Sequence, residues 1–134
     1  KKKLEKKTYE NKSNNKLKKE DAEFVKSNSV LVKDNQFHII YKPFQDSLSE
    51  EAIIKVIETS NKFNKEQIIT IKSYASRNKS QGSSEARRLS LSRALEVRSI
   101  FIENNFPATN ILIKALGTEK NKEGFTDIIL IEVN

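Results

Sequence analysis

The residues with the clearest potential for chemistry are arginines gathered in one segment of the chain. Four of the five arginines lie within residues 84–98, although lysine is the usual basic residue elsewhere. A guanidinium is a planar fork that binds a carboxylate or a phosphate through two hydrogen bonds, which a lysine ammonium cannot do. We therefore expect Arg93, with Arg77 in the preceding loop, to converge on one anion near the start of a helix. We interpret Arg88 and Arg98 as surface residues that pair with nearby glutamates.

The sequence gives little support for catalysis or for a metal site. It has no cysteine, which excludes disulfides, thiol catalysis and cysteine-based zinc sites. The single histidine, His38, cannot build a histidine-rich metal site, and we interpret it as a residue on the face of a strand. Glu50 and Glu51 suit the positive end of a helix dipole better than acid–base chemistry. We predict a non-catalytic protein without cofactor or metal.

Positive charge is concentrated in the first quarter of the chain. Of a formal net charge of +7, residues 1–34 carry +5, from 11 lysines and 6 acidic residues. We predict that residues 1–28 form a Lys-rich, disordered linker, because they hold too few apolar residues to offset the entropy of ordering. A solvated tether is the favoured interpretation, and an arm that binds an anionic surface is the alternative. A nucleic-acid partner is not favoured, because the remaining residues are almost neutral and show no aromatic stacking signals.

The patterns of apolar residues predict one domain over residues 29–134, with its core in residues 36–134. Ser49 can cap a first helix, Ser83 or Ser84 can cap a second, and Asn105 with Pro107 can end the second. The expected elements are strands at 29–33 and 36–41, a helix after Ser49, a strand at 67–74, a helix from Glu85 to about Asn105, and strands at 110–116 and 127–133.

The order β-α-β-α-β-β predicts a fold of the α/β class, and more specifically an α+β sandwich. We expect a mixed parallel and antiparallel sheet with both helices packed on one face. Strands separated by a helix favour parallel pairing through right-handed crossovers. The last two strands, joined by the polar loop from Gly117 to Gly124, are expected to pair antiparallel with each other.

The stretch from Phe37 to Val133 resembles the OmpA-like domain, the peptidoglycan-associated module also found in Pal lipoproteins and MotB-type stators. The segment LSLSRALEV at 89–97 fits the pattern L-S-x-x-R-A-x-x-V of that family. The turn at Pro107 follows this segment, and Gly117 comes after it, both at the sequence distances expected for that family. The strand–helix order implied by the resemblance is the same as the order expected from the apolar patterns.

The resemblance implies a non-catalytic periplasmic domain of the bacterial cell envelope. Family members hold the diaminopimelate residue of the peptidoglycan stem peptide, with an aspartate on its ammonium group and the motif arginine on its carboxylate. Peptidoglycan or an envelope protein is thus the expected partner, and a homo-oligomer is possible. Because the sequence begins with Lys rather than Met, we expect a longer or processed protein, anchored to the outer or inner membrane through a segment outside this sequence.

The resemblance also implies where the ligand would bind. The candidate ligand-binding residues are Arg93, Ser76, Arg77, Asn78, Leu89 and Ser90. Arg93 takes the place of the family arginine, whereas Ser76 stands where the family has its aspartate, and Thr126-Asp127 replaces a basic pair.

Losing the charged partner of the ligand ammonium is expected to weaken binding by about 1.5–3 kcal/mol, or roughly tenfold to over a hundredfold. Restoring an aspartate at position 76 is expected to raise the affinity. The alternative hypothesis is a degenerate module that acts as a protein-interaction or structural element of an envelope assembly. Saturation of Arg93 by carboxylates of the protein itself would favour that alternative.

Overall fold

The computed structural model describes residues 28–33, 36–77 and 82–134. The predicted linker, except for Asn28, therefore lies outside the described residues, as do residues 34–35 and the candidate Asn78. The elements are β1 (Ser29–Lys33), β2 (Gln36–Ile40), α2 (Glu50–Ser60), β3 (Ile69–Tyr74), α3 (Ser83–Glu103), a 3-10 turn (Ala108–Asn110), β4 (Ile111–Gly117) and β5 (Ile128–Val133).

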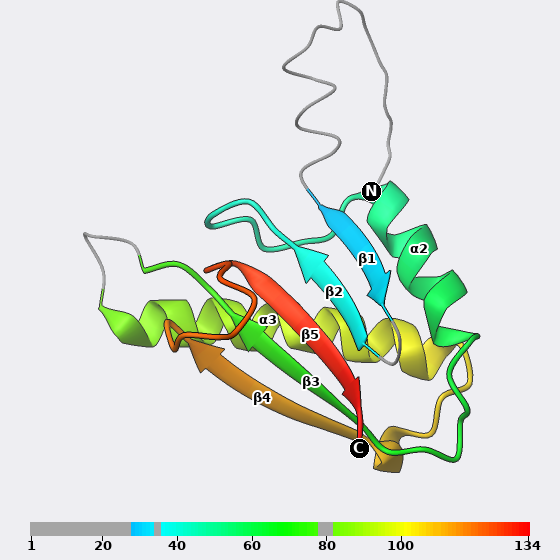
Figure 1. Cartoon of the computed structure of the whole chain (residues 1–134). Coiled ribbons are helices and arrows are strands. Elements are labelled where there is room, and N and C mark those ends of the chain that lie inside the picture. The colour runs from blue at the N-terminus through cyan, green and yellow to red at the C-terminus, as the bar shows by residue number, and fades with distance from the viewer. Residues whose placement is uncertain (1–27, 34–35, 78–81) are drawn as a thin grey trace, which may run out of the picture.

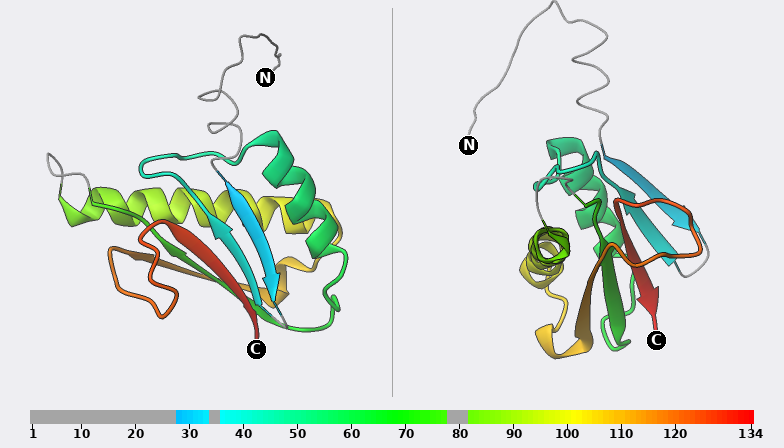
Figure 2. Two further views of the ribbon diagram at one scale, coloured as in Figure 1. Left: turned by 45° about the horizontal axis from the view of Figure 1, so that its top comes forward. Right: turned by 90° about the vertical axis from the view of Figure 1, so that its left-hand side faces the viewer.

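The five strands form one mixed sheet in the order β1-β2-β5-β3-β4. β5 is antiparallel to both of its neighbours, β1 and β2 are antiparallel to each other, and β3 and β4 are parallel. Both helices cover the same face of the sheet (Figures 1 and 2). The predicted fold class, a mixed sheet with two helices on one face, is confirmed.

The predicted pairing of the last two strands is wrong. β5 inserts between β2 and β3, and β4 forms an edge beyond β3. The first four residues of β5, Ile128–Ile131, are all buried, which suits a central strand with both faces covered. The connection from β4 to β5 therefore passes the end of β3 instead of closing a hairpin.

Two of the three predicted helix ends are confirmed by the structure. The Ser49 hydroxyl accepts a hydrogen bond from Ala52 N at 3.2 Å and caps α2, as predicted. Asn105, with a φ of 73°, ends α3 in the left-handed conformation, also as predicted. The prediction for the start of α3 is wrong, because the cap position is Gly82 and no side chain bonds there. In the described parts of the chain, no helix has the length and apolarity needed to cross a bilayer.

The main core lies between the sheet and the helices. Strand alternation turns one residue in two toward this layer, so the buried residues of β2, β3 and β5 on this face are Phe37, Ile39, Ile69, Ile71, Ile129 and Ile131. Ala94, Val97 and Phe101 of α3 pack onto them. Among the described residues, the buried apolar side chains of the opposite face form a small cluster of Tyr74, Ile128 and Leu130. A residue in phase with Ile129 and Ile131 therefore points toward α3.

Candidate functional site

Arg93, the central candidate of the sequence analysis, is a core residue. It lies in α3 on the face that packs against the sheet, and its side chain is 0% exposed. Burial of a charged guanidinium is costly unless all of its hydrogen-bonding groups find partners. The partners of Arg93 therefore decide what this side chain can do.

The protein itself binds the guanidinium of Arg93 through four hydrogen bonds. Nε donates to the carbonyl oxygen of Gln45 at 2.7 Å, and Nη2 donates to that of Lys42 at 3.2 Å. Nη1 donates both to the carbonyl oxygen of Tyr74, at 3.1 Å, and to Asp127 Oδ1, at 2.9 Å. Arg93 thus connects the loop after β2, the end of β3 and the start of β5 from its position on α3.

Asp127 is the carboxylate that neutralises Arg93, and it is 4% exposed. Its Oδ1 also accepts from the backbone N–H of Ser76, at 3.0 Å. Its Oδ2 accepts from the Ser76 hydroxyl and, at 3.1 Å, from the Thr126 hydroxyl. Four donors therefore surround this carboxylate, which leaves little capacity for a ligand group.

A carboxylate does lie beside position 76, but Asp127, which directly precedes β5, supplies it. Ser76, which the resemblance predicts to take the place of a ligand-binding aspartate, donates from both its hydroxyl and its backbone N–H to Asp127. The structure brings Arg93 and Ser76 together as predicted, but through Asp127, which the sequence analysis did not select. The alternation of side chains could have identified Asp127. It lies two residues before the buried Ile129, so its side chain faces α3 as well.

The loop after β2 is held against Arg93 in a strained turn. Gln45 N donates to the Lys42 carbonyl oxygen at 3.1 Å, so residues 42–45 form a β-turn with Pro43 second and Phe44 third. Phe44 has a φ of 66°, in the left-handed region that costs a residue with a Cβ about 1–2 kcal/mol. The Arg93 bonds to the carbonyl groups of Lys42 and Gln45 keep this turn in place.

The free energy of unfolding of Phe44→Gly is expected to exceed that of Phe44→Ala by about 1 kcal/mol, because only glycine adopts a positive φ without strain. Both Phe44→Gly and Phe44→Ala remove the same ring, which is 54% exposed. Urea unfolding of the two variants isolates the backbone term. Equal stability of the two would show that the turn relaxes without strain.

Two further groups shape the electrostatics around Arg93. Its guanidinium lies 4.4 Å from the centre of the Tyr41 ring, a cation–π contact. Burial raises the pKa of the Tyr41 phenol, with a further rise from Glu96, so the phenol stays neutral at physiological pH. Burial also raises the pKa of the Glu96 carboxyl, against the hydrogen bond from Leu48 N. Glu96 and Asp46 both raise the pKa of the Tyr41 phenol, so two acidic side chains lie near the ring that contacts Arg93.

None of the other candidates that the structure describes forms a hydrogen bond with Arg93. The Ser90 hydroxyl is buried, donates to the Arg87 carbonyl oxygen at 2.8 Å and accepts from Gly117 N at 3.2 Å, so it joins α3 to β4. Gly117 is required there, because its φ is 57° and an added Cβ would lie 3.4 Å from the backbone of Arg87. Leu89 is half-buried on α3. Arg77 is exposed, whereas the side chain of Arg93 is 0% exposed, so an anion dissolved in water that meets Arg77 has no access to Arg93 in this structure.

The surface role predicted for Arg88 is confirmed. Arg88 Nη1 lies 2.6 Å from Glu85 Oε2, and both side chains are exposed. Among the residues that the structure describes, no group of three His, Cys, Asp or Glu side chains could hold a metal ion.

The comparisons with known proteins agree with this architecture. A model of the OmpA family matches residues 40–127, a stretch that contains both Arg93 and Asp127. No protein of curated function matches the chain in sequence. The OmpA-like domain of FopA1 from Francisella tularensis is 15% identical over 80% of this chain and 81% of that one, with a TM-score of 0.58.

Two other solved structures share the fold. The periplasmic domain of Helicobacter pylori MotB is 8% identical over 80% of this chain and 81% of that one, with a TM-score of 0.55. The peptidoglycan-associated lipoprotein from Burkholderia pseudomallei is 10% identical over 72% of this chain and 86% of that one, with a TM-score of 0.50. At such identities the likeness concerns the fold alone.

Proposed function

The chain belongs to the OmpA family, and from this membership we propose that it is a non-catalytic domain of the bacterial cell envelope that associates with peptidoglycan. The fold it shares with a periplasmic domain of MotB and with a peptidoglycan-associated lipoprotein supports this assignment. We place the domain in the periplasm, attached to a membrane through a segment outside the present sequence.

The binding of a stem-peptide carboxylate is proposed to be weak, and the ion pair between Arg93 and Asp127 carries this part of the proposal. Asp127 Oδ1 lies 2.9 Å from Arg93 Nη1, and three backbone carbonyl groups use other donors of the guanidinium. A ligand carboxylate would have to displace a carboxylate that is already bound and desolvated. The exchange replaces one charge-assisted hydrogen bond with another and yields little net free energy.

Cosedimentation with purified peptidoglycan sacculi tests the association. We expect a fraction of the protein to sediment with sacculi, and to remain bound when the salt concentration is raised from about 0.05 M to 0.5 M. The salt step matters because residues 1–34 carry a net charge of +5, and such nonspecific attraction is screened at high salt. Loss of all binding at high salt, or no binding at either concentration, would contradict the proposed association.

A second function of another class is favoured by the same ion pair. Because Arg93 and Asp127 satisfy each other, the domain can serve as a protein-interaction or structural element of an envelope assembly that has lost its ligand. Under this alternative, sacculi bind no more protein than an unrelated control of the same charge. The cosedimentation experiment therefore separates the two functions.

A further inference from the structure

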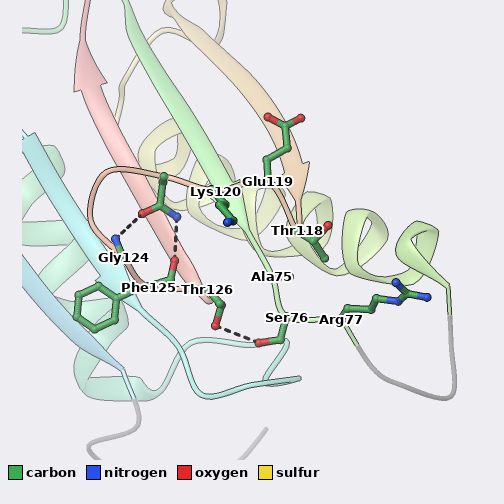
Figure 3. A pocket seen from close by; sticks show the side chains of 10 residues that line it. Ala75, Ser76, Arg77, Thr118, Glu119, Lys120, Gly124, Phe125 and Thr126 are labelled. Carbon is green, nitrogen blue, oxygen red and sulfur yellow. Dashed lines mark hydrogen bonds between the residues drawn. The ribbon is translucent and has the colours of Figure 1, made fainter.

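A cavity of about 440 Å³ lies at the carboxyl ends of β3 and β4 (Figure 3). It is lined by Ala75, Ser76 and Arg77, which follow β3, and by residues 118–121 and 124–126 of the loop after β4. A register shift after Ser73 pairs Tyr74 with Gly117, and Ala75 N donates to the Gly117 carbonyl oxygen at 2.8 Å. The cavity has the size of small-molecule sites, which range from about 300 to 1,000 Å³.

The loop that forms one wall is held in shape by its own residues. Asn121 Nδ2 donates to the carbonyl oxygen of Phe125 at 2.8 Å, and Asn121 Oδ1 accepts from the backbone N–H groups of Glu123 and Gly124. Gly124 has a φ of 81°, which glycine adopts without strain. A wall fixed in this way does not have to be ordered by a ligand, and this lowers the cost of binding.

The side chains around the cavity are positively charged on balance. Lys120 and Arg77 are exposed, and neither forms an ion pair with any residue that the structure describes. Glu119 is the one acidic residue of the lining, and Figure 3 shows its carboxylate pointing away from Ser76 and Thr126. The cavity thus offers a cation, Lys120, to an anionic group.

The side opposite Lys120 offers hydrogen-bond acceptors. Ser76 and Thr126 both donate their hydroxyl protons to Asp127, and their oxygens lie 3.3 Å apart. The remaining lone pairs of these oxygens are available to an N–H donor. In Figure 3, Ser76 and Thr126 lie across the hollow from Lys120, and Phe125 and Arg77 lie at its two ends. Phe125 is 47% exposed and supplies an apolar surface.

We propose that this cavity binds the C-terminal residue of a peptide chain. The terminal carboxylate pairs with Lys120, the amide N–H of the same residue donates to Ser76 or Thr126, and an apolar side chain packs against Phe125. The proposal goes beyond the proposed function, because Arg93 takes no part in it and the peptide need not come from peptidoglycan. Its failure would leave the cosedimentation result unaffected.

Three compounds with the same apolar body test the proposal in nuclear magnetic resonance titrations of the whole chain. N-acetylphenylalanine carries both the carboxylate and the N–H group. Its amide, N-acetylphenylalaninamide, lacks the charge and is expected to bind about tenfold more weakly. The ester analogue O-acetyl-3-phenyllactate lacks the N–H group and is expected to bind about threefold more weakly. The shifted amide resonances should belong to residues 75–77 and 118–126.

A matched pair of lysine variants completes the experiment. Lys120→Gln is expected to weaken the binding of N-acetylphenylalanine about tenfold. Lys122→Gln removes the same charge from the same loop but from outside the cavity lining, and should leave the affinity unchanged. The proposal is overturned if all three compounds bind alike, if no saturable shifts occur in the named residues, or if both lysine variants weaken binding equally.

Discussion

Replacing Asp127 with alanine is expected to lower the free energy of unfolding by about 3–5 kcal/mol, the range for removing one partner of a buried ion pair. The reason is that the guanidinium of Arg93 is 0% exposed and would keep its charge without a counter-charge. The backbone N–H and hydroxyl of Ser76 would also lose their acceptor. Urea or thermal unfolding followed by circular dichroism measures the loss.

The exposed ion pair of Glu85 and Arg88 supplies the control. Its side chains are 40% and 72% exposed, so Glu85→Ala is expected to cost less than about 1 kcal/mol. The comparison separates the effect of burial from the loss of an acidic side chain. A loss for Asp127→Ala as small as that for Glu85→Ala would mean that Arg93 does not depend on Asp127.

Much of the fold could be predicted because local patterns determine it. The alternation of apolar residues identified the strands that contain Phe37, Ile71 and Ile129, and Ser49 identified the start of α2. The position of β5 could not be predicted from the length of the loop before it. Its run of buried residues, Ile128–Ile131, marks a strand with both faces covered, and this pattern indicates a central position better than the chain order does.

The site could be predicted only in part, because its decisive contact is between distant residues. The arginine pattern located Arg93, but the residue that pairs with it lies 34 positions along the chain. Which carboxylate reaches Arg93 depends on β5 lying next to β3, and the prediction for the neighbours of β5 was wrong. Ser76 was selected because its position resembles a ligand-binding position of the family. In the structure its hydroxyl donates to Asp127.

The second large effect is expected from moving the carboxylate back to the family position. The double variant Ser76→Asp/Asp127→Asn keeps one carboxylate in the site but places it at position 76, which is half-buried instead of buried. We expect its affinity for diaminopimelate-containing stem peptides to rise by about 1.5–3 kcal/mol, because the ligand ammonium regains an accessible counter-charge. This corresponds to roughly tenfold to over a hundredfold.

The single variant Ser76→Asp is the control for this exchange. Ser76→Asp alone would place a second carboxylate against Asp127, whose Oδ2 the Ser76 hydroxyl now contacts. Like charges at that distance destabilise each other, so this variant is expected to unfold more easily than the double variant. The structure therefore changes the expectation that an aspartate at position 76 would be sufficient by itself.

Titration of a diaminopimelate muropeptide into the unmodified chain and the double variant tests most directly whether Asp127 has taken the place of a ligand at Arg93. Isothermal calorimetry at one salt concentration gives both dissociation constants. The closed ion pair predicts weak binding to the unmodified chain and binding at least about tenfold tighter to the double variant. Tight binding to the unmodified chain, with equal or weaker binding to the double variant, would contradict the account.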